Sequence, residues 1–161
     1  MKKMTLGMRL NNPMCIRYNI HNRWLGTCGK SNGFVKFNIV DNGIRAGVKI
    51  LLRYIFNYHL YSYREIIERY APSSENDVNA YLVAIYNYTG MYEDTSFICE
   101  DSIFLLRLQL LVYGIIRVEN GIVDDFLSKE FIFDKVTEYF NEYLDDYLYI
   151  VHGKLPLRQI L

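Results

Sequence analysis

Residues 101–121 read DSIFLLRLQLLVYGIIRVENG, the most apolar stretch of the chain. Over 102–119 the hydrophobic side chains lie on nearly all faces of a helix, which is typical of a central buried helix. Asp101 is placed to cap its start, and Gly121 is placed to end it because glycine readily adopts a left-handed backbone. We therefore predict a mainly helical protein (mainly α, α+β) built around this helix.

Glu119 lies in the last turn of this helix. The helix dipole disfavours a carboxylate at that end, and partial desolvation favours its neutral form. Both effects predict a raised pKa, the property by which glycosidases keep a general acid protonated near neutral pH. The alternative is that Glu119 is a polar residue at a helix end that is satisfied by solvent.

The remaining patterns predict shorter elements around the central helix. Residues up to about 33 are rich in turn-forming Asn and Gly, and 33–39 can form a short strand or part of a hairpin. Apolar periodicity and capping residues predict further helices over 42–58, from Ser62 to Tyr70, from Ser74 to Gly90, and over 128–149. We expect one domain over 1–125 and a C-terminal helical extension packed on it over 126–161.

Composition is that of a globular protein of one domain, with 161 residues, of which 51% are hydrophobic and 22% charged. The charges are divided unevenly along the chain. Residues 1–60 contain ten Lys and Arg against the single acid Asp41, whereas residues 61–161 contain eight against seventeen acids. The basic residues are dispersed rather than clustered, so we do not expect nucleic-acid binding.

Several classes of site have no supporting pattern. The three cysteines form neither a CxxC motif nor a Cys/His quartet, and the three histidines have no partner spacing, so we expect no metal and no cofactor. The start of the chain shows no secretion signal, and the apolar stretch 103–118 is interrupted by charges. We therefore expect a protein made in the cytoplasm without membrane insertion.

The last helix has two distinct faces. Its apolar face is formed by Phe133, Val136, Phe140, Tyr143 and Tyr147, and its acidic face, here called the acidic stripe, by Glu130, Asp134, Glu138, Glu142 and Asp146. Like charges at this spacing repel by a few tenths of a kcal/mol per pair. Neutralising Asp134, Glu138 and Glu142 together should therefore leave the helix as stable or slightly more stable. The stripe is either a solvated face or a docking surface for a basic carrier, virion or inhibitor (immunity) protein.

Four short segments form a further pattern: NNPMCIR at 11–17, GIRA at 43–46, RYAPSSEN at 69–76 and ENG at 119–121. Together they resemble a phage and prophage family with NNPxNIR, GIRA and RxAPxxEN motifs, whose members are described as virion-associated proteins. The resemblance covers about residues 10–122. Met14-Cys15 stands where that family usually has Gly-Asn.

The same segments are similar to parts of the lysozyme-like superfamily in a shifted order. The end of the apolar helix resembles the helix of lytic transglycosylases that ends in the catalytic Glu, and residues 11–52 resemble the segment that follows this Glu in glucosaminidases. The resemblance implies a circularly permuted lysozyme-like domain that cleaves peptidoglycan. It implies catalytic roles for Glu119 and Tyr81, and substrate contacts by Asn11, Asn12, Arg17, Tyr18, Trp24, Phe34 and Glu75.

Each of these residues also has a purely structural interpretation. Tyr81 fits the core as well as a cleft, and Asn11 and Asn12 are ordinary turn residues. Trp24 can cover the core, and Glu75 can be a first-turn residue favoured by a helix dipole.

The leading hypothesis is a glycosidase in which Glu119 protonates the oxygen between N-acetylmuramic acid and N-acetylglucosamine. It would reach the cell wall in a phage particle, through a lysis route, or through a contractile secretion system. The rival is a non-catalytic structural protein of a virion or injection apparatus with the same fold. A third, nucleic-acid binding through the basic first half, would show affinity that falls steeply with salt.

Overall fold

The computed structural model describes residues 3–152, with side chains for residues 3–146. It is mainly helical with one antiparallel hairpin, as the sequence predicts. Within the described range the elements in chain order are α1 (Leu6–Arg9), β1 (Thr27–Ser31), β2 (Phe34–Phe37), α2 (Val40–Phe56), α3 (Tyr63–Tyr70), α4 (Val78–Thr89), α5 (Asp101–Asn120) and α6 (Lys129–His152).

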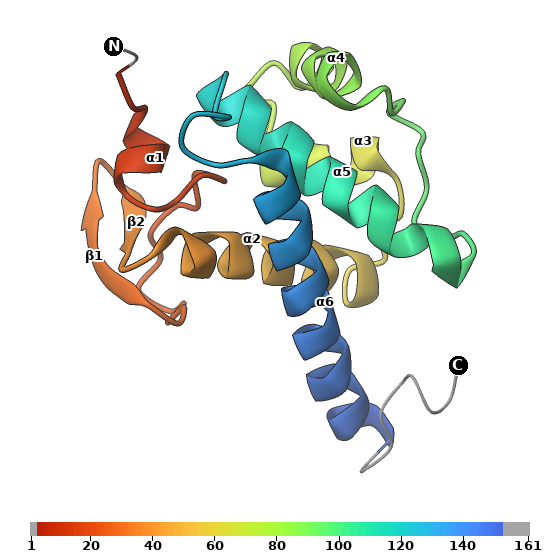
Figure 1. The fold of residues 1–161 in the computed structure, drawn as a ribbon. Coiled ribbons are helices and arrows are strands. Elements are labelled where there is room, and N and C mark those ends of the chain that lie inside the picture. The colour runs from red at the N-terminus through yellow and green to blue at the C-terminus, as the bar shows by residue number, and fades with distance from the viewer. Residues whose placement is uncertain (1–2, 153–161) are drawn as a thin grey trace.

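Helix α5 runs through the middle of the molecule, with α4 along one side and α6 along another (Figure 1). Its second half is buried almost continuously, from Leu111 to Ile116. Helix α6 also crosses α2, and α1 lies with the hairpin at the end of the molecule where α2 begins (Figure 1). A single hydrophobic core therefore joins α2, α3, α4, α5 and α6. No helix within residues 3–152 is long and apolar enough to cross a membrane.

Several helix ends follow their sequence signals. The Ser62 side chain accepts a hydrogen bond from the Glu65 backbone N–H at 3.1 Å and caps α3. Gly90 and Gly121 end α4 and α5 with φ angles of 73° and 72°, in the region that favours glycine.

Other ends and one strand differ from the predictions. Asp77, not Ser74, caps α4, because its carboxylate accepts from the Ala80 N–H at 3.0 Å. Asp101 lies inside the first turn of α5, and Glu100 occupies the cap position without a side-chain bond. Strand β1 is almost fully exposed, so its sequence lacks the apolar alternation that would have predicted it.

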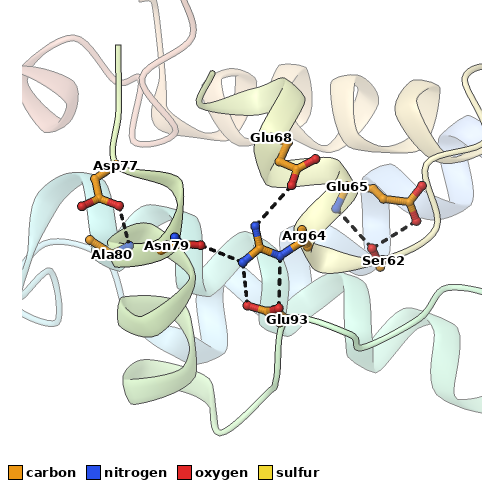
Figure 2. A network of polar contacts seen from close by, with 8 residues as sticks. All are labelled: Ser62, Arg64, Glu65, Glu68, Asp77, Asn79, Ala80 and Glu93. Atoms are coloured by element: carbon orange, nitrogen blue, oxygen red, sulfur yellow. Dashed lines mark hydrogen bonds and ion pairs between the residues drawn. The ribbon is translucent and has the colours of Figure 1, made fainter. Parts of the chain in front are cut away.

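The Arg64 side chain links helices α3 and α4 through hydrogen bonds (Figure 2). Its guanidinium donates to Glu68 on α3 at 3.2 Å, to Asn79 on α4 at 2.8 Å, and to Glu93 in the segment after α4 at 2.8 Å. The bidentate pair with Glu93 is the geometry in which arginine binds carboxylate best. These hydrogen bonds of Arg64 therefore hold α3 and α4 together, and the loop that carries Glu75 connects these two helices.

The acidic stripe of α6 is not simply solvated, because α2 supplies basic partners for part of it. Glu142 accepts from Arg45 at 2.5 Å and pairs with Lys49 at 3.2 Å, and Lys49 also lies 3.9 Å from Asp146. Lys135 on α6 pairs with Glu138 and with Asp41 on α2. The expectation that neutralising the stripe costs no stability is therefore wrong for Glu142. The Tyr147 side chain and residues 153–161 of the expected extension lie outside the described residues.

Glu142→Gln should destabilise the protein by about 1–2 kcal/mol, because it leaves two half-buried cations with a weakened partner. Burial works against ionisation of Glu142, but bonds from Arg45 and Lys49 outweigh it and hold its pKa below the ordinary value. The wild-type advantage should thus be present at neutral pH and disappear as pH falls through that pKa. Chemical denaturation at several pH values measures it. Glu130→Gln, an exposed change on the same helix, should change stability by less than about 0.5 kcal/mol.

The GIRA segment packs directly on the NNP segment. A Cβ at Gly43 would overlap the carbonyl oxygen of Asn11, and one at Gly47 would overlap the Met14 side chain. These two glycines let α2 approach the N-terminal loop closely. Met14 fills the resulting gap and is fully buried.

Gly43→Ala should therefore destabilise by about 1–3 kcal/mol, although alanine is the better helix former. Thermal unfolding or denaturant titration measures the change. Asn87→Ala, at an exposed interior position of α4, is the control and should be neutral or slightly stabilising. A Gly43→Ala protein as stable as the control would show that the close approach is not required.

Candidate active site

A cleft of about 330 Å³ lies where the N-terminal loop, α2, the α3–α4 loop and the end of α5 meet. Glu119 lies in its wall together with Cys15, Arg17 and Phe34. Tyr70 and Glu75 line it from α3 and the loop that follows. Residues from four distant parts of the sequence thus surround one carboxyl group.

Asn120 fixes the helix end that carries Glu119. Its buried amide donates to the Pro13 carbonyl at 2.6 Å and to the Ile116 carbonyl at 2.8 Å, while its oxygen accepts from the Thr5 hydroxyl at 2.6 Å. The Tyr70 hydroxyl donates to the Met14 carbonyl. The loop before Cys15 is therefore held against the last turn of α5 from two sides.

Two donors converge on the Glu119 carboxyl. The Tyr81 hydroxyl on α4 donates to Glu119 Oε1 at 2.9 Å, and Tyr81 itself is only 6% exposed. The Cys15 thiol lies within hydrogen-bonding reach of the same carboxyl. Cys15 has a φ of 54°, a left-handed conformation that is uncommon for a residue with a side chain. This backbone turn brings the thiol to the glutamate.

Burial raises the pKa of Glu119 above its ordinary value of 4.5. The bonds from Tyr81 and Cys15 and the charge of Arg17 act in the opposite direction and do not cancel it. Burial and the neighbouring Glu119 raise the pKa of the Cys15 thiol to about 12. Cys15 therefore stays protonated at neutral pH, and acts as a donor to Glu119 rather than as a nucleophile.

Arg17 connects two walls of the cleft. Its guanidinium lies over the Phe34 ring, 5.2 Å from the centroid, and pairs with Glu75 at 3.2 Å. Both charged groups are more than half exposed, so the pair itself adds little stability. Its effect is to keep a cation and a second carboxylate at the cleft mouth.

The structure brings together five of the nine residues expected at the site. Glu119, Arg17, Phe34 and Glu75 line the cleft, and Tyr81 reaches Glu119 from behind it. Trp24 lines an adjoining hollow. Tyr18 does not line the cleft, and instead lies beneath Lys30, whose Nζ is 4.5 Å from the ring centroid.

Asn11 and Asn12 have structural roles instead. Asn12 is fully buried, donates to the carbonyls of Ile16 and Val35 at 2.9 Å, and accepts from the Ile16 N–H. Asn12 has no solvent-exposed surface through which to contact a substrate, so the expected substrate contact is wrong for this residue. Asn11 donates its amide to the Phe37 carbonyl at 3.1 Å and does not line the cleft.

Sequence reasoning did not assign a site role to several cleft residues, among them Cys15, Tyr54, Arg69 and Tyr70. Cys15, Arg69 and Tyr70 lie inside the quoted motifs, so the motifs contained a signal for them. No sequence pattern pointed to Tyr54, because it lies within α2 outside the quoted motifs.

Comparison with known proteins gives a phage relative. Protein P5 of Pseudoalteromonas phage PM2 is 37% identical to this chain over 89 residues, which cover 53% of this chain and 56% of the phage protein. No protein-family model matches the chain. The chain is thus similar to a phage protein over about half of each length, and that protein's name states no activity. Among the side chains that the structure describes, residues 3–146, no group of three or more His, Cys, Asp or Glu is arranged to hold a metal ion.

Glu119→Gln should leave the protein at least as stable as the wild type at pH 7. A carboxyl whose pKa is raised on folding is destabilising when ionised, so wild-type stability falls as pH rises from 4.5 through the folded-state pKa. The glutamine oxygen can still accept from Tyr81. In denaturant titrations from pH 3 to pH 8, the free energy of unfolding of the variant relative to that of the wild type should increase as pH rises through this range. Equal pH dependence of the two proteins would contradict the raised pKa.

Proposed function

We propose that this protein is a peptidoglycan-cleaving glycosidase of the lysozyme or lytic transglycosylase kind, with Glu119 as the general acid. The observation that carries the proposal is a cleft-lining carboxyl with a raised pKa, held by donors from Tyr81 and Cys15. A protonated carboxyl that is fixed in direction and open to a cleft is what protonation of a leaving-group oxygen requires. The lysozyme-like resemblance of the sequence supports the same assignment.

In this mechanism Glu119 protonates the oxygen between N-acetylmuramic acid and N-acetylglucosamine, and the bond to the leaving sugar breaks. Apart from Glu119, Glu75 is the one carboxylate among the described residues that line the cleft, and it is paired with Arg17. Glu75 and Arg17 are therefore better suited to positioning the sugar than to attacking it. The substrate's own acetamido oxygen attacks the anomeric carbon as the bond to the leaving sugar breaks and forms a cyclic oxazolinium ion, so no enzyme nucleophile is needed. Water or the sugar's 6-hydroxyl then opens this ion, giving a reducing or an anhydro end, and the proton of the water or hydroxyl passes to the Glu119 carboxylate.

The test is digestion of purified sacculi followed by mass analysis of the released fragments. Wild type should release muropeptides, with anhydro ends for a transglycosylase and reducing ends for a hydrolase. Glu119→Gln should lower the rate by about 10²–10⁴-fold, because proton transfer to the leaving group is lost. Glu130→Gln removes one exposed acid that does not line the cleft, and it should leave the rate unchanged. No release by folded wild type would reject the proposal.

The second candidate is a non-catalytic structural protein of a phage particle or injection apparatus. The similarity to a phage protein favours this setting without favouring either function. Under this alternative, Glu119→Gln leaves the biological phenotype intact. We further propose that the chain acts at the cell wall after delivery by a phage particle, a lysis route or a contractile secretion system.

A further inference from the structure

A second hollow of about 420 Å³ continues the Glu119 cleft along α2. The two share Asn22, Ile50, Tyr54 and Arg69, so they form one continuous depression. Trp24, Arg53 and Tyr58 line only the second part, here called the distal hollow. The proposed reaction at Glu119 assigns no role to the distal hollow.

The distal hollow is lined by hydrogen-bond donors and by no acidic residue. The Arg69 guanidinium lies 4.1 Å from the Tyr58 ring centroid, and the Arg53 guanidinium lies 5.8 Å from that of Trp24. Neither arginine forms an ion pair with a carboxylate among the described residues, whereas Arg45 and Arg64 do. Both charges are thus held in place by aromatic faces and remain available to an anion.

A third donor in this wall lacks an acceptor. The indole Nε1 of Trp24 is shielded from solvent and has no hydrogen-bond partner within the described residues. Unpartnered polar atoms of this kind are rare in folded proteins. With this indole N–H and two guanidiniums that form no ion pair with a described carboxylate, the distal hollow is suited to a ligand rich in acceptor oxygens.

We propose that the distal hollow binds carboxylates carried on the muramic acid side of the substrate, on its lactyl group or its peptide branch. This inference rests on the function proposed above. Arg69 lines both the cleft and the distal hollow, so a sugar beside Glu119 could direct its substituent past Arg69 toward Arg53. Planar guanidinium groups match carboxylate geometry, and uncharged sugar hydroxyls would not require them.

Binding is measured with the full chain carrying Glu119→Gln, so that cleavage does not consume the substrate. The test variant adds Arg53→Gln and Arg69→Gln, and the control adds Arg9→Gln and Arg23→Gln. The control removes the same charge from exposed positions of the same basic half that line neither the cleft nor the hollow. Thermal unfolding checks that both remain folded.

Three glycans separate the sources of the carboxylate: intact sacculi, strands stripped of peptide by an amidase, and chitin oligosaccharides without carboxylates. The test variant should lose about tenfold or more in affinity for sacculi, for stripped strands or for both, and the control less than about twofold. The lactyl carboxyl is an amide wherever a peptide is attached and becomes a free carboxylate only on stripped strands. A loss confined to stripped strands therefore assigns the lactyl carboxylate, a loss confined to sacculi assigns the peptide carboxylates, and a loss on both shows that the site accepts either. Chitin binding should not change.

Unchanged affinity for both sacculi and stripped strands, or the same loss on chitin, would overturn the proposal. Tighter binding to a single-stranded oligonucleotide than to sacculi, lost in the test variant, would also overturn it and indicate a phosphate site. Failure of the proposed glycosidase activity gives a result that differs from failure of the proposed carboxylate site. If the unmutated chain does not cleave sacculi but binds them through Arg53 and Arg69, the glycosidase proposal fails and the carboxylate site stands.

Discussion

The buried amide of Asn120 is the interaction on which the arrangement of the site depends. It joins the last turn of α5 to the Pro13 carbonyl and the Thr5 hydroxyl, segments more than 100 residues earlier in the chain. Leaving such a group unpaired inside the protein would cost about 1–3 kcal/mol, so the helix end and the loop are fixed as a pair. Gly7 lies against this amide, and a Cβ there would come within 2.9 Å of the Asn120 oxygen. Glu119 gains its position, its burial and its contact with Cys15 from this attachment.

The quoted sequence motifs are explained largely by packing around that attachment. The Asn12 side chain is hydrogen-bonded to β2 and so fixes the loop. Gly43 and Gly47 have no side chain, which leaves space for the Asn11 carbonyl and the Met14 side chain to pack against α2. The long helices were predictable because apolar periodicity and glycine stops are local signals. The left-handed backbone at Asn11 and Cys15 was not, since it depends on contacts with α2 and α5 that lie far away in sequence. For the same reason two asparagines that look suited to sugar binding serve the loop instead.

The electrostatics of the site were predictable in part. The end of a buried helix was enough to predict the direction of the Glu119 pKa, and burial proves to be the main cause. The residues that interact with Glu119 were harder to predict. Cys15 and Arg17 lie about 100 residues from Glu119 in sequence, and only the fold brings them close to it. The partners also limit the shift, since each one favours the ionised form. Burial thus favours the neutral form of Glu119, whereas the donors that orient its carboxyl group favour the ionised form.

Helix α2 divides the basic charge of the first half of the chain between two faces. Arg45 and Lys49 form ion pairs with Glu142 and Asp146 on α6, so part of the basic first half of the chain is paired with the acidic second half. Arg53, one turn further along, lies instead beside Trp24 at the hollow, where no described carboxylate meets it. On α2, the charges that face α6 are thus paired within the chain, whereas Arg53 beside the hollow forms no ion pair with a described carboxylate. Folding alone does not require the second arrangement, and this is why we propose a ligand for the distal hollow.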